Sequence, residues 1–99
     1  MSTKVMISQP MRNKTIEQVR NERENVVKKL QEYGYTILDT VFGNPMQTDE
    51  NEAICNLAES IKYIAKANVI YFMKGWEYSR GCKIEHEVAV QYGKKILYE

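Results

Sequence analysis

The stretch NVIYFMKGWEYSRGCKIEHEVAVQYG, from Asn68 to Gly93, decides how the rest of the chain is arranged. It begins with an apolar run of β-branched and aromatic residues, Val69 to Met73, which is typical of a strand buried on both faces. A loop that contains two glycines follows over Lys74–Gly81. A helix then begins, and its apolar residues recur on one stripe, at Ile84, Val88, Ala89 and Tyr92, before Gly93 ends it. Strand, loop and helix in this order form half of an α/β unit, so we expect a ligand site at this loop, beyond the carboxyl end of the strand.

The rest of the chain repeats this alternation of strands and helices. Its predicted elements are a strand over Lys4–Ser8, a helix from the capping box of Thr15 and Gln18 to Gly34, a strand over Tyr35–Phe42, a loop over Gly43–Asp49, a helix carrying Ile54, Leu57, Ala58, Ile61, Ile64 and Ala65, and a last strand over Lys94–Tyr98. The order βαβαβαβ predicts a parallel sheet with right-handed crossovers and a helical layer on each face. We therefore expect one domain over residues 1–99, a flavodoxin- or Rossmann-like three-layer α/β sandwich with four parallel strands in the order 2-1-3-4.

Composition and short motifs exclude several classes of function. The formal net charge is +1 and no run is rich in lysine or arginine, so we expect no nucleic-acid partner. No apolar stretch approaches the roughly 20 residues of a membrane span, and the apolar run at the N-terminus is too short for a signal peptide. We expect a cytoplasmic protein without a membrane partner, in which Cys55 and Cys82 are free thiols. The turn after the first strand, SQPMRN, matches neither phosphate-loop pattern, so no cofactor is expected. The single histidine, His86, is interpreted as a surface residue, and no metal site is expected.

Glu85 is the candidate reactive group of the predicted site. It shares a helical stripe with Gly81 and Ala89, whose small size leaves space around its carboxylate. The positive end of the helix is expected to keep Glu85 ionised, and the backbone amides near the helix start suit an anion such as phosphate. An ionised carboxylate beside a sugar can act as a nucleophile at the anomeric carbon.

Three further side chains have two interpretations each. Trp76 can offer an aromatic face to a base or a sugar, or it can be a packing anchor. Arg12 and Arg80 can pair with a phosphate, or they can be solvated surface charges.

Two segments carry a resemblance to a known family. ISQPM, from Ile7 to Met11, is close to the ISGPM of that family, and GWEYSRGCKIEHEVAVQYG, from Gly75 to Gly93, contains the pattern GW-x-x-SRG-x-x-x-E-x-x-x-A-x-x-x-G. The chain resembles small bacterial and phage proteins related to the nucleoside 2-deoxyribosyltransferases and the deoxynucleoside 5′-monophosphate N-glycosidases. These enzymes cleave the bond between base and deoxyribose. The resemblance implies that Glu85 is the nucleophile.

The same resemblance implies a ligand and an oligomeric state. The loop after the first strand would line the sugar site with Ser8, Gln9, Pro10, Met11 and Arg12. The turn of Ser79, Arg80 and Gly81 would face a 5′-phosphate or the sugar. We expect a nucleoside or nucleotide as ligand and a homo-oligomer, most simply a dimer, in which a neighbour closes each site.

The chain departs from the family pattern at three positions. Ser60 and Asn68 stand where the deoxyribosyltransferases carry acids, so a general acid for the leaving base is missing. Gln9 replaces a glycine, which is expected to crowd the sugar pocket. Two functions remain open: an N-glycosidase or deoxyribosyltransferase in which Glu85 attacks C1′, and a non-catalytic protein that binds a nucleotide to sequester or sense it. A purely structural oligomer does not explain the residues that gather at the strand end.

Overall fold

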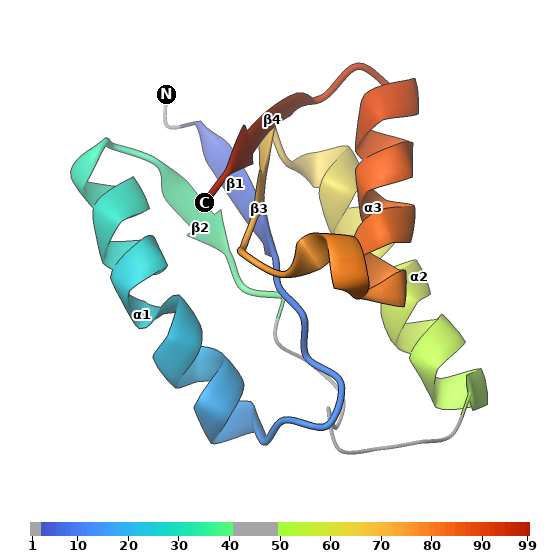
Figure 1. The fold of residues 1–99 in the computed structure, drawn as a ribbon. Coiled ribbons are helices and arrows are strands. Elements are labelled where there is room, and N and C mark those ends of the chain that lie inside the picture. Colours follow the sequence, from blue (N-terminus) through green and yellow to red (C-terminus); the bar gives the residue numbers. More distant parts are fainter. Residues whose placement is uncertain (1–2, 41–49) are drawn as a thin grey trace.

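The computed structural model describes residues 3–40 and 50–99. Within them the predicted alternation of strands and helices is confirmed (Figure 1). The elements are β1 (Lys4–Ser8), α1 (Ile16–Glu32), β2 (Thr36–Leu38), α2 (Glu50–Lys66), β3 (Val69–Phe72), a short 3₁₀ helix η1 (Trp76–Tyr78), α3 (Arg80–Gln91) and β4 (Lys95–Tyr98). None of the helices in these two ranges is long and apolar enough to cross a membrane.

The four strands form one parallel sheet in the order β2-β1-β3-β4, as predicted. Val5 of β1 lies opposite Ile37 of β2 on one side and Val69 of β3 on the other. The chain moves from β1 to β2 in one direction across the sheet and then returns past β1 to β3. Strands β1 and β3 therefore flank the point where the strand order reverses, and this is where parallel α/β sheets place their ligands.

Helices cover both faces of the sheet, which makes the protein a Rossmann-like three-layer sandwich. Figure 1 shows α1 on one face and α2 with α3 on the other. Successive side chains of a strand point to opposite faces, so β1 contributes to two cores. Val5 packs with Leu30 of α1 on one face, whereas Met6 packs with Ile64 of α2 and Ala89 of α3 on the other. Because both cores run through β1 and β3, Val5–Ile7 of β1 and Val69–Phe72 of β3 are buried on both faces of the sheet.

The second strand is shorter than the predicted range of Tyr35–Phe42. Beyond Leu38 the contact with β1 is made by a side chain, because the hydroxyl of Thr40 donates a hydrogen bond to the carbonyl oxygen of Ile7 at 3.3 Å. The end of the predicted strand and the predicted loop over Gly43–Asp49 lie outside the described residues.

The predicted loop over Lys74–Gly81 is partly helical. It includes η1, and α3 already begins at Arg80. Gly75 initiates η1 with a φ of 93°, a left-handed conformation that residues with a Cβ rarely adopt. A Cβ at this position would lie 3.7 Å from Cγ of Pro10, so the loops that follow β1 and β3 approach each other here.

Candidate functional site

A cavity of about 670 Å³ opens at the carboxyl edge of the sheet, where the sequence predicts a site. Its lining comes mainly from the loop after β1, the first half of α2, and the segment from η1 through the first turns of α3. This volume lies within the range of roughly 300–1,000 Å³ that is usual for small-molecule sites. The cavity is therefore large enough for a ligand of nucleotide size.

Glu85 lies in the wall of this cavity and is buried, with 7% of its surface exposed. Its Oε1 accepts a hydrogen bond of 2.9 Å from Oγ of Ser8, the last residue of β1. Burial raises the pKa of Glu85 to about 7, while the hydrogen bond from Ser8 and the positive charge of Arg23 act in the opposite direction. The expectation of a fully ionised carboxylate is therefore wrong. The effect of a helix terminus fades within the first turn, and at Glu85 it is smaller than the loss of hydration.

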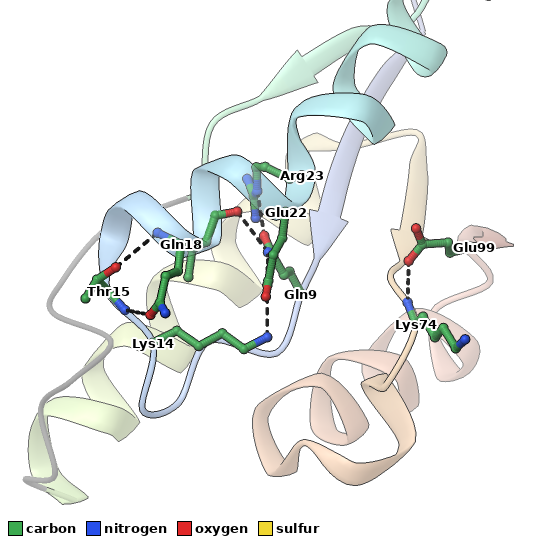
Figure 2. Close-up of polar contacts among 9 residues, drawn as sticks. Gln9, Lys14, Thr15, Gln18, Glu22, Arg23, Lys74 and Glu99 are labelled. Atoms are coloured by element: carbon green, nitrogen blue, oxygen red, sulfur yellow. Dashed lines mark hydrogen bonds and ion pairs between the residues drawn. The ribbon is translucent and has the colours of Figure 1, made fainter.

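A second buried network fixes the loop that follows β1 (Figure 2). Gln9 is 5% exposed, and its Oε1 accepts a hydrogen bond of 2.7 Å from Nε of Arg23 on α1. Its Nε2 donates to the carbonyl oxygen of Val19 at 2.9 Å and to Oε1 of Glu22 at 3.1 Å. The amide group of Gln9 is thus engaged with α1, although the residue still contributes to the cavity wall.

Arg23 is a buried cation that sequence reasoning assigned no role. It is 5% exposed, and among the described residues its Nη2 has no hydrogen-bond partner. Burial lowers its pKa to about 10, which still leaves the guanidinium charged at neutral pH. A signal was present in the sequence, because Arg23 interrupts the apolar stripe of its helix between Val19 and Val26.

The start of α1 is held by a confirmed capping box and an ion pair (Figure 2). Oγ1 of Thr15 accepts from the amide of Gln18 at 3.0 Å, and Oε1 of Gln18 accepts from the amide of Thr15 at 2.8 Å. Nζ of Lys14 lies 2.9 Å from Oε1 of Glu22. The loop after β1 is therefore tied to α1 at its beginning, through Gln9, and at its end.

Two arginines at the mouth of the cavity share one carboxylate. Nη2 of Arg80 lies 3.0 Å from Oε2 of Glu50, and Nη2 of Arg12 lies 3.7 Å from Oε1 of the same residue. All three side chains are more than half exposed. Glu50 is the first residue of α2 and no sequence pattern singled it out, because the contact joins three segments that are distant in the chain.

Trp76 lies in an aromatic cluster with Phe72, His86 and Tyr98. Its ring stacks on that of His86 with a centroid distance of 4.2 Å, and its centroid lies 5.3 Å from that of Phe72. Trp76 is not among the described residues that line the cavity. The structure thus favours the packing interpretation of Trp76 over the ligand-contact interpretation.

The structure brings most of the other predicted site residues together. Those that line the cavity are Gln9, Pro10, Met11, Arg12, Ser79, Arg80, Gly81 and Glu85. Ser8 reaches the site through its hydrogen bond to Glu85.

The two positions at which the deoxyribosyltransferases carry acids, Ser60 and Asn68 in this chain, lie at different places in the structure. Ser60, on α2, lines the cavity with a hydroxyl in place of a carboxyl group. Asn68 lies at the opposite edge of the sheet, where its Oδ1 accepts a hydrogen bond of 2.8 Å from the amide of Lys4 at the start of β1. Among residues 3–40 and 50–99, no group of three or more His, Cys, Asp or Glu side chains is placed to hold a metal ion.

The fold and the cavity define a Rossmann-like α/β protein with a candidate small-molecule site at the switch point of its sheet. The chain belongs to the family described as a domain of unknown function, DUF4406, which matches residues 3–98. No curated protein and no solved structure gives a significant match. The family description assigns no activity, so a relation to the deoxyribosyltransferases stays a prediction.

Proposed function

We propose that this protein binds a nucleoside or a 5′-nucleotide in the cavity and cleaves its base–sugar bond, with Glu85 as the nucleophile. The observation that carries this proposal is the position of Glu85: a buried carboxyl group in the wall of a ligand-sized cavity, with one oxygen held by Ser8. A carboxyl group that is removed from water beside a cavity is a recognised mark of a functional site.

The reaction assigns a separate task to each oxygen of Glu85. Ser8 donates to Oε1 and orients the carboxylate, so Oε2 attacks C1′ of the sugar. The new C1′–O bond forms as the C1′–N bond breaks, and the electron pair leaves with the base, which takes a proton from water. Water or a second base then attacks C1′ of the glycosyl ester and releases the carboxylate.

The protonation of Glu85 sets the pH at which this chemistry operates. Only the ionised carboxylate is a nucleophile, and with a pKa of about 7 it is ionised in about half of the molecules at neutral pH. Base release should therefore rise with pH through about 7 and level off above it. Ser60 cannot protonate the leaving base as a carboxyl group would, so turnover should be slow.

The lack of a carboxyl group at Ser60 also favours a second function. A cavity that keeps its arginines and its buried Glu85, but has a hydroxyl at Ser60, also suits a protein that binds a nucleotide without cleaving it. Such a protein would sequester or sense the nucleotide.

One experiment separates the two functions. The wild-type protein, Glu85→Gln and the control Glu87→Gln are incubated with a panel of deoxynucleosides and their 5′-monophosphates, and free base is measured by chromatography. Glu87→Gln removes the same charge from the exposed side of α3. We expect base release from the wild type and from Glu87→Gln, and none from Glu85→Gln. Equal release by wild type and Glu85→Gln would exclude Glu85 as the nucleophile. Nucleotide binding without base release by any of the three would establish the binding function.

A further inference from the structure

The contact of Arg12 and Arg80 with Glu50 brings two cations to one anion. Arg12 comes from the loop after β1 and Arg80 from the first turn of α3, and each approaches a different oxygen of Glu50. The three charges sum to +1, and each guanidinium offers five N–H donors while Glu50 supplies one oxygen to each. The pair of arginines is therefore matched only in part by this carboxylate.

A phosphate monoester matches the two arginines better than Glu50 does. It carries a charge of about −1.5 to −2 at neutral pH and three acceptor oxygens, which can pair with guanidinium groups. Space is present at the start of α3, because a Cβ added at Gly81 would meet no described atom within 4 Å outside its chain neighbours and the adjoining helix backbone. The first turn of α3 also contains no acidic residue that would repel an anion.

We infer that Glu50 occupies the place of the ligand's phosphate and is displaced when a 5′-phosphorylated ligand binds between Arg12 and Arg80. This inference rests on the proposed function for the class of ligand. It makes Glu50 a built-in competitor that lowers phosphate affinity and leaves the affinity for an unphosphorylated nucleoside unchanged. Displacement is easy, since ion pairs between side chains as exposed as these are each worth only about a two- to fivefold change in an equilibrium constant.

The chain offers a matched control for this inference. Glu50→Gln frees both arginines without changing the size of the side chain. Glu52→Gln removes the same charge from the same turn of α2 and from the lining of the same cavity, but Glu52 forms no ion pair with any described residue. The difference between the two variants isolates the competition from the general loss of a negative charge.

The test measures binding of inorganic phosphate and of 2-deoxyribose 5-phosphate by calorimetry. We expect Glu50→Gln to bind both probes about three- to tenfold more tightly than wild type, and Glu52→Gln to change affinity less than twofold. Adding Arg80→Ala to Glu50→Gln should remove the gain. Equal gains in the two glutamine variants, no gain in Glu50→Gln, or no detectable phosphate binding by any variant would overturn the inference.

A nucleoside arm completes the design. A deoxynucleoside that the wild type binds should bind equally well to Glu50→Gln. Weaker nucleoside binding by that variant, with unchanged phosphate affinity, would identify Glu50 as a ligand of the sugar and overturn the inference. Phosphate binding is measured without any base cleavage, so failure of this inference leaves the proposed reaction intact, and failure of the reaction leaves the phosphate result standing.

Discussion

Replacing Glu85 with Gln should make the protein more stable at neutral and alkaline pH. The pKa of this carboxyl group is raised from 4.5 to about 7 by burial, so the folded state binds its proton more tightly than the unfolded state does. The protonated form therefore contributes stability that is complete below pH 4.5. That contribution falls as pH rises toward about 7 and is lost above it. Glutamine keeps the shape and has no proton to lose, so Glu85→Gln removes this dependence.

The size of the effect follows from the pKa. At roughly 1.4 kcal/mol per pKa unit, the difference between 4.5 and about 7 corresponds to about 3 kcal/mol. This is a large part of the roughly 5–15 kcal/mol by which domains are stable. For a chain of this size, with a urea slope near ~1.5 kcal/mol per molar, the unfolding midpoint should shift by about 2 M.

The assay is urea unfolding at a series of pH values from below 4.5 to above 7, for wild type, Glu85→Gln and Glu87→Gln. The informative quantity is the difference in unfolding free energy between wild type and each variant, because other titrating groups cancel in it. For Glu85→Gln the difference should grow across the window, whereas for Glu87→Gln it should stay nearly constant. A constant difference for Glu85→Gln would show that its carboxyl group is not desolvated, and the proposed pH dependence of the reaction would fail with it.

Four more expectations follow from the same contacts. Ser8→Ala and Arg23→Gln should each raise the pKa of Glu85 further, because the Ser8 hydrogen bond and the Arg23 charge both lower it. Ser8→Ala should have the larger effect, and a carboxyl ¹³C NMR titration that gives the opposite order would contradict this. Phe72→Ala should lower the unfolding free energy by about 3–5 kcal/mol in urea melts, since Phe72 is fully buried; a loss below ~1 kcal/mol would refute its place in the core. Trp76→Phe should leave nucleotide affinity within twofold of wild type by calorimetry, and a larger loss would place Trp76 against the ligand. Sedimentation at micromolar concentration should show a homodimer, and a single species of 11.6 kDa would count against it.

The fold was predictable from the sequence because the apolar runs of the strands and the alternation of strands with helices indicate the same architecture. The run at Lys4–Ser8 appears as β1 with the predicted bounds, and the apolar run that begins at Val69 forms the buried strand β3. Alternation of strands and helices then predicts a parallel sheet, and the order 2-1-3-4 is one that doubly wound sheets commonly adopt. Local patterns of this kind need no knowledge of the tertiary structure.

The site was predictable only in its position. Strand ends identify Glu85 and the loop after β1, but depth of burial is a tertiary property, so the helical stripe could not reveal that the pKa of Glu85 is raised. Glu50 forms ion pairs with two arginines from other segments, and no spacing pattern in the sequence predicts these contacts. Arg23 is intermediate, since its place on an apolar stripe was visible but its partner Gln9 was not.

The long separation between Ser8 and Glu85 along the sequence has a consequence for folding during synthesis on the ribosome. The two residues of this hydrogen bond are 77 positions apart in the chain. The amide of Lys4 in β1 can donate to Asn68 only after 64 further residues have been synthesised. At about 5–20 residues per second, translation leaves one edge of β1 without its neighbour for roughly 3–13 s. During that interval the nascent chain exposes an apolar strand edge, the kind of surface that recruits chaperones or other nascent chains. The carboxyl group of Glu85 reaches Ser8 only after most of the sheet can form, so an incompletely synthesised chain cannot contain this buried hydrogen bond.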